Sequence, residues 1–153
     1  MRTGKIAKYP HYLGFTLIEL LVSIATAFVL LVLAAFNFKQ LENKTLNTAN
    51  GVVGFLKVVR ARALTNSLAY EVAPVSLQLL RARAKKSCVA DQYLDDFYDY
   101  ELREGVIIDN PNWNTCYSAR GMASQAVNFK VTDGSNSRVV EVVLGGAVRQ
   151  FAE

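Results

Sequence analysis

One carboxylate lies inside a long apolar run, and it is the residue of this chain with the most specific chemistry. Residues 14–38 are apolar apart from small hydroxyls, Asn37 and Glu19. A charge at membrane depth costs about 2.5–3.5 kcal/mol on insertion scales, so it persists where it has a partner or a task. The segment ahead of it carries cations and no acid: Arg2, Lys5 and Lys8. We therefore expect Glu19 to have an ionic partner or a functional role.

The residues around Glu19 form a recognisable motif. From Gly14 the sequence reads G-F-T-L-I-E-L-L-V-S-I. It resembles the class III signal of type IV prepilins and type II secretion pseudopilins. The resemblance implies that a prepilin peptidase removes residues 1–14 by cleaving between Gly14 and Phe15, and that it methylates the new amine of Phe15.

The same run is long enough for a membrane anchor. A bilayer core needs about 20 apolar residues, and residues 15–38 exceed that number. A secretory signal is the alternative, but its apolar core has about 7–15 residues and ends in an A-x-A-like site. An anchor without any further role would leave Glu19 unexplained. The basic leader is expected to stay in the cytoplasm, which places the later residues outside it.

The motif also implies a role for Glu19 in assembly. Side-by-side packing of such helices in a dry filament core would leave the Phe15 amine and the Glu19 carboxylate unpaired. Pairing the amine of one subunit with Glu19 of its neighbour neutralises both and sets the axial step between subunits. Breaking a buried pair costs about 3–5 kcal/mol, so the pair can specify register even when it adds little stability.

Two cysteines, Cys88 and Cys116, follow the apolar run. In an exported domain they face an oxidising compartment, where a disulfide persists. Such a bridge would contribute about 3.5 kcal/mol on the loop-entropy estimate. Two buried thiols are the alternative. A structural zinc site needs two more ligands, and the only histidine is His11 in the leader.

The basic residues give a weaker signal. The whole chain has 17 basic and 13 acidic residues, or +4; without the three leader cations it has 14 and 13, or +1. Nucleic-acid binding would therefore need a local patch, and the candidates are Arg81, Arg83, Arg138 and Arg149. A solvated face, or ion pairs with the acidic stretch at residues 91–104, is the alternative. The adjacent Asp95 and Asp96 match no calcium loop, so we expect no metal site.

The hydrophobic periodicity predicts an α+β fold. One helix is expected from about residue 15 to 66, with residues 15–38 apolar and residues 39–66 amphipathic. Alternating apolar residues then indicate a small antiparallel β domain over residues 67–153. Within it, residues 70–79 read as a strand disturbed by Pro74, residues 91–104 as irregular or a short helix, and residues 113–121 as a loop. Asp133-Gly134 between alternating runs marks a hairpin.

The tail adds a second resemblance. The order L-x-x-x-R-A-R-A (Leu56–Ala63), L-R-E-G-V-I-I, V-N-F-K and a closing G-x-x-x-R is similar to GspH/FimT-type minor pseudopilins. This implies a pilin-like fold, and a minor subunit of a type II secretion pseudopilus or type IV pilus near its tip. Its partners would be prepilin peptidase, other pilins and the inner-membrane assembly platform. A DNA-uptake pilin is the alternative, because some FimT-type pilins bind DNA through tail arginines, where Arg149 falls.

No catalytic function is expected. The mature chain has no histidine, no nucleophile–base set and no glycine-rich phosphate loop. We therefore predict a subunit that is not an enzyme and that needs no cofactor. It is expected in the bacterial inner membrane as a single-pass protein with an extracytoplasmic β domain.

Overall fold

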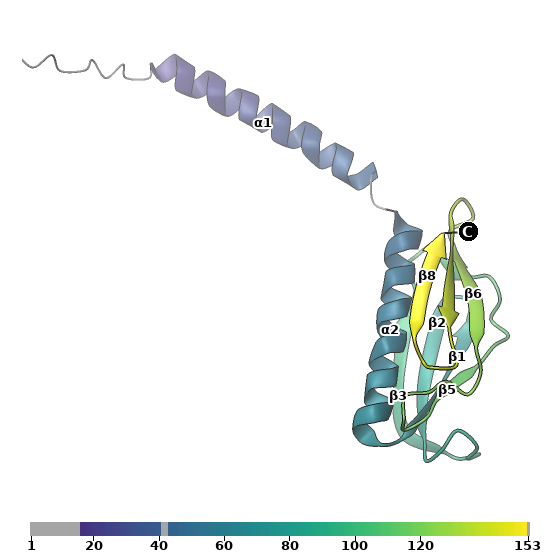
Figure 1. Ribbon diagram of the computed structural model, residues 1–153. Helices are drawn as coiled ribbons and strands as arrows, with labels where there is room; N and C mark the ends of the chain where they lie inside the picture. The colour runs from purple at the N-terminus through teal and green to yellow at the C-terminus, as the bar shows by residue number, and fades with distance from the viewer. Residues whose placement is uncertain (1–15, 41–42, 153) are drawn as a thin grey trace, which may run out of the picture. The chain divides into compact units, whose positions relative to one another are not determined.

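The computed structural model describes residues 16–40 and 43–152, with the backbone alone for residues 34–40. The chain divides into two units, residues 1–42 and residues 43–153. The first unit contains α1 (Leu17–Gln40), and the second contains α2 (Lys44–Asn66) followed by strands β1 to β8 (Figure 1). Gly14 and Phe15, between which cleavage is predicted, lie outside the described residues.

The prediction of one continuous helix over residues 15–66 is wrong at Asn43. This residue has an extended backbone (φ −73°, ψ 96°), and its Oδ1 accepts a hydrogen bond from the Leu46 N–H at 2.9 Å. Asparagine is a strong N-cap because its side chain satisfies one of the donors that the first helical turn leaves unpaired. α2 is therefore a separate helix with its own cap.

The amphipathic stripe predicted for the second helix is confirmed. One face of α2 is buried along its length: Thr45, Thr48, Ala49, Val52, Val53, Leu56, Val59 and Ala63. These positions follow the three-and-four spacing of a helix with one apolar face. The helix ends at Ser67, which adopts the left-handed conformation with φ 53°.

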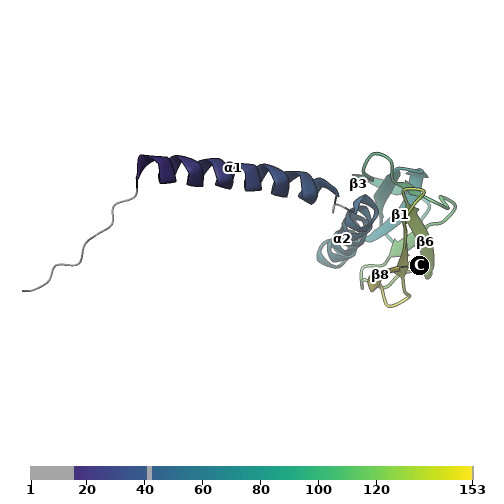
Figure 2. The ribbon, with the colours of Figure 1, turned by 90° about the horizontal axis from the view of Figure 1, so that it is seen from above.

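The strands form two antiparallel sheets. Sheet A has the order β3-β2-β1-β5 and consists of β1 (Ala69–Ser76), β2 (Leu79–Lys85), β3 (Tyr93–Glu101) and β5 (Thr115–Tyr117). Sheet B has the order β4-β6-β7-β8 and consists of β4 (Ile107–Ile108), β6 (Val127–Thr132), β7 (Ser137–Val142) and β8 (Val148–Ala152). α2 contacts strands of both sheets, and Figure 2 shows it beside them.

The predicted hairpin at Asp133-Gly134 is confirmed. β6 pairs with β7, with Phe129 opposite Val140. In the turn, Asp133 Oδ1 accepts hydrogen bonds from the N–H groups of Asn136 at 2.7 Å and Ser135 at 2.9 Å. This side-chain turn fixes the register of the two strands.

Three predictions for sheet A need correction. Residues 70–79 are two strands, because Leu77 and Gln78 form a turn, and the pairing is irregular between Pro74 and Ser76. Residues 93–101 form strand β3, although they lie in the acidic stretch 91–104 that was predicted as irregular or a short helix. Residues 115–117 form strand β5 within the predicted loop.

The core lies entirely within residues 43–153. It consists of the buried face of α2 and the inner side chains of both sheets, including Tyr70, Leu80, Tyr117, Phe129 and Val140. Because this unit contains every buried core residue among those that the structure describes, and α2 carries its own N-cap, we expect residues 43–153 to fold without α1.

Candidate assembly site

α1 exposes an apolar surface that has no cover within the described chain. Twelve of its large apolar side chains are between 41% and 78% exposed, from Leu17 to Leu33. Its hydroxyls bond back to the helix: Ser23 Oγ donates to the Glu19 carbonyl at 2.7 Å, and Thr26 Oγ1 donates to the Val22 carbonyl at 3.0 Å. A helix that is apolar on every side needs lipid or other helices around it.

The sequence predicts that residues 15–38 cross a membrane as a helix. Among the helical residues that the structure describes, no helix is both long enough and apolar enough to cross a membrane.

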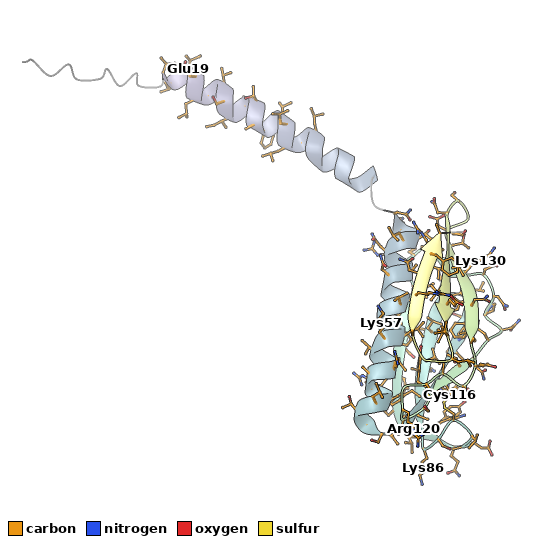
Figure 3. All side chains as sticks on the ribbon, in the orientation of Figure 1. Glu19, Lys57, Lys86, Cys116, Arg120 and Lys130 are labelled. Carbon is orange, nitrogen blue, oxygen red and sulfur yellow. A yellow bond between two sulfur atoms is a disulfide. The ribbon has the colours of Figure 1, made fainter. Side chains whose placement is uncertain are left out.

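Glu19 lies in the first turn of α1 and caps it (Figure 3). Its Oε2 accepts hydrogen bonds from the Thr16 N–H at 3.0 Å and the Thr16 hydroxyl at 2.9 Å. In return, the Glu19 N–H donates to Thr16 Oγ1 at 3.3 Å. This reciprocal pair is a capping box. The negative charge also lies at the helix end where the backbone dipoles favour it.

The capping box leaves part of the Glu19 carboxylate available for another partner. Both hydrogen bonds that its carboxylate accepts in the described chain go to Oε2. Thr16 holds the Glu19 side chain at the N-terminal end of α1. Glu19 is exposed, so its carboxylate is not buried in a core. The carboxylate is therefore oriented for a cation that approaches the start of the helix. The T-x-x-E spacing of residues 16–19 is the sequence signal for this cap, which was not among the predictions.

The predicted disulfide between Cys88 and Cys116 is present, with 5.7 Å between the Cα atoms. Cys88 lies in the loop between β2 and β3, and Cys116 lies in β5. Because β1 separates β2 from β5 in sheet A, the bridge ties the β2–β3 loop to the opposite edge of the sheet. Cys116 is buried, at 4% exposed.

The four candidate arginines lie on two different sheets. Arg81 and Arg83 lie on β2 in sheet A, whereas Arg138 and Arg149 lie on β7 and β8 in sheet B. Two are paired with acids: Arg81 binds Asp99 through two hydrogen bonds of 2.6 and 2.7 Å, and Arg149 Nε binds Glu141 at 2.6 Å.

The ion pair between Arg81 and Asp99 shifts the pKa of both side chains. The hydrogen bonds to Asp99 raise the pKa of Arg81 and lower that of Asp99. The guanidinium of Arg83 lies 5.1 Å from the centroid of the Tyr93 ring. The predicted alternative, ion pairs with the acidic stretch, is therefore present at Arg81. DNA binding by the four arginines stays a prediction.

Arg60 of α2 has a structural role. Its Nε donates to the Gly121 carbonyl at 2.9 Å, and its Nη2 donates to the Gly145 carbonyl at 3.1 Å. Gly121 follows β5 of sheet A, and Gly145 lies in the turn between β7 and β8 of sheet B. One side chain of α2 therefore joins loops from both sheets. The glycine at 146 is required there, since a Cβ would lie 1.9 Å from the Gly121 carbonyl oxygen.

No protein-family model and no curated protein sequence matches this chain. Solved structures do match it. Two crystal structures of the type IV minor pilin FimU of Pseudomonas aeruginosa have TM-scores of 0.54 and 0.53 at 12% and 16% identity. These matches cover 69% and 72% of this chain, and 91% and 89% of the FimU chains.

The minor pseudopilin EpsH from the type 2 secretion system of Vibrio cholerae matches with a TM-score of 0.51 at 13% identity. This match covers 72% of this chain and 98% of the EpsH chain. At these identities the comparison establishes the fold. The chain has the pilin-like α+β fold of minor pilins and minor pseudopilins, which is the fold class that the sequence predicts.

Proposed function

We propose that this chain is a minor pilin or minor pseudopilin subunit that assembles through α1. The observation that carries the proposal is the exposed apolar surface of α1, with Glu19 in its first turn. Other pilin-type helices are the cover that fits both features, because they provide apolar packing and a cation. The pilin-like fold of residues 43–153 supports the same reading.

The proposal includes processing and location. Prepilin peptidase cleaves after Gly14 and methylates Phe15, and residues 15–38 hold the subunit in the inner membrane until the assembly platform inserts it near the filament tip. This part rests on the G-F-T-L-I-E motif and on the apolar sequence of residues 15–38. The intact mass of the protein from a host with prepilin peptidase should show loss of residues 1–14 and one added methyl group. A mature start beyond residue 30 would contradict it.

The role of Glu19 in assembly is to neutralise the Phe15 amine of a neighbouring subunit. The capping box supplies an alternative explanation, because removing Glu19 also removes the carboxylate that accepts from the Thr16 N–H and so weakens the start of the helix. Two substitutions separate these roles. Glu19→Gln keeps a capping side chain but removes the charge, whereas Thr16→Ala removes the capping partner and keeps the charge.

The test is incorporation of each variant into filaments, measured by crosslinking at matched protein level. If charge pairing drives assembly, Glu19→Gln is excluded from filaments as completely as Glu19→Ala, and Thr16→Ala is incorporated. The reverse pattern, with Glu19→Gln incorporated and Thr16→Ala excluded, would show that Glu19 acts only as a helix cap. Residues 43–153 should fold normally in all three variants, since the described core lies within that unit.

A further inference from the structure

β3 is an open edge of sheet A. It is nine residues long, from Tyr93 to Glu101, and it pairs with β2 on one side. Within the described residues no strand pairs with its other side. An unpaired edge is a template for an added strand unless charged side chains, proline or a bulge blunt it. β3 contains no lysine or proline, and its pairing with β2 is irregular between Arg83 and Lys85 but regular from Phe97 to Glu101. Its acids repel a strand of like charge, so the edge favours a basic one.

The ladder with β2 shows which backbone groups of β3 are available. The Leu102 N–H donates to the Gln78 carbonyl at 2.8 Å, in register with Tyr100 opposite Leu80. Antiparallel residues alternate between facing the partner strand and facing away from it. The backbone groups of Tyr98 and Tyr100 thus face β2. Those of the odd-numbered residues face the open side: Phe97, Asp99 and Glu101.

The outer surface of β3 is aromatic and acidic. Phe97 is 57% exposed and Tyr93 is 46% exposed. Asp95 and Glu101 are exposed on the same surface, because their positions alternate with the inward-facing residues. Side chains of α2 contact the opposite surface, where Arg62 lies 3.6 Å from the Tyr98 ring centroid. The outer surface of the edge is therefore accessible.

The sequence of β2, the strand that pairs with β3, indicates which side chains fit next to the outer surface of β3. β2 reads L-L-R-A-R-A-K, with a cation at every second residue. Arg81 pairs with Asp99 and lies 5.2 Å from the Phe97 ring centroid. Arg83 lies opposite Phe97. A basic, alternating strand thus satisfies both the acids and the rings of β3.

A second copy of β3 does not fit the open side. Antiparallel pairing centred on Phe97 places Asp95 of one copy opposite Asp99 of the other. Pairing centred on Tyr98 places Asp95 opposite Glu101. Like charges directly opposite one another destabilise a strand pair, so self-association through β3 is disfavoured.

We propose that β3 binds an extended basic segment of a partner protein by strand addition, with alternating cations and small apolar residues facing Asp95, Phe97 and Glu101. Main-chain hydrogen bonds to the open edge supply affinity, and the acids and rings select the sequence. This inference does not depend on assembly through α1.

The experiment uses residues 43–153 and a blocked peptide with the β2 sequence, L-L-R-A-R-A-K. The control peptide carries an N-methyl group on the backbone nitrogen of each arginine, which keeps the charge but removes the two backbone donors that would face the odd-numbered residues of β3. Each lost hydrogen bond costs about 1 kcal/mol, so the control should bind about tenfold more weakly or worse by calorimetry. On binding of the first peptide, hydrogen exchange should slow at the amides of Phe97, Asp99 and Glu101. Exchange at Tyr98 and Tyr100 should stay unchanged.

Matched charge reversals complete the test. Asp95→Lys should weaken binding several-fold, whereas Glu104→Lys, at an exposed position beyond the strand, should leave it nearly unchanged. Equal binding of the two peptides, or equal weakening by the two variants, would show that only net charge is recognised and would overturn the proposal. Binding without slowed exchange at the three amides would overturn it too. Dimerisation that protects these amides without peptide would make a second copy the occupant and would equally overturn it.

Discussion

Two glycines of α2, three residues apart, should respond in opposite directions to the same substitution. A Cβ at Gly51 would lie 1.9 Å from the hydroxyl oxygen of Tyr100 and 2.9 Å from its Cζ. The ring of Tyr100 is itself stacked on Phe55, with 5.5 Å between centroids, so it has little room to retreat. A Cβ at Gly54 would meet no atom within 4 Å. Gly51 thus permits a close approach of β3 to the helix.

The magnitudes follow from helix propensity and packing. Replacing glycine with alanine inside a helix contributes about 1 kcal/mol of stability, which Gly54→Ala should show in full. Gly51→Ala gains the same amount but overfills the contact with Tyr100, at a cost of about 1–3 kcal/mol. The free energy of unfolding of Gly51→Ala should therefore lie about 1–3 kcal/mol below that of Gly54→Ala. Urea denaturation of oxidised residues 43–153 measures this difference if the slope m is unchanged.

Tyr100→Phe tests the cause directly. It removes the hydroxyl, so the nearest atom to the new Cβ becomes Cζ at 2.9 Å. In this background Gly51→Ala should cost less, which appears as a coupling free energy in the double-mutant cycle. The reasoning is refuted if Gly51→Ala stabilises as much as Gly54→Ala, or if Tyr100→Phe leaves the effect of Gly51→Ala unchanged.

Three further predictions concern the same unit. Arg60→Ala should lower the free energy of unfolding by about 1.5–3 kcal/mol, because two charged hydrogen bonds are lost, and Arg60→Lys should recover little of it; an unchanged urea midpoint would contradict this. Cys88→Ala together with Cys116→Ala should cost about 3.5 kcal/mol in the same assay, and a loss below 1 kcal/mol would contradict the loop-entropy account. Hydrogen bonds from backbone N–H groups, that of Asn136 first, hold the pKa of Asp133 well below its ordinary 3.8. Its contribution to stability is therefore present above pH 3.8 and is lost as the pH falls through the lower folded value. An NMR titration of the Asp133 carboxyl with an ordinary pKa would rule this out.

The sequence predicts the elements whose local signals agree with their packing. The α2 stripe and the β6–β7 hairpin combine periodicity with turn chemistry, and both are confirmed. β3 was missed because its acids suggest solvent, whereas pairing with Arg81 makes an alternating acidic strand stable. The helix break at Asn43 was missed because the periodicity continues across it, and only one capping side chain marks the boundary.

The site was predictable in its residue types and less so in its contacts. Glu19 stands out because a charge in an apolar run is costly, but its bonds to Thr16 appear only once the start of α1 is known. The disulfide was predicted from two cysteines in a domain that the sequence is expected to export. Arg60 could not be predicted, because its partners are main-chain carbonyls 61 and 85 residues away, and no residue type records them.

The disulfide also has a mechanical consequence when the chain is placed under tension. Tension applied through α1 enters the globular unit at Asn43 and would strip α2, β1 and β2 before it reached Cys88. The bridge spans a sequence separation of 28 residues, and an extended chain advances about 3.4 Å per residue. The oxidised chain at full extension is therefore shorter than the reduced chain by about 90 Å. Because the bridge closes residues 88–116 into a covalent loop, β3 and β5 stay linked after the rest of sheet A has been pulled apart.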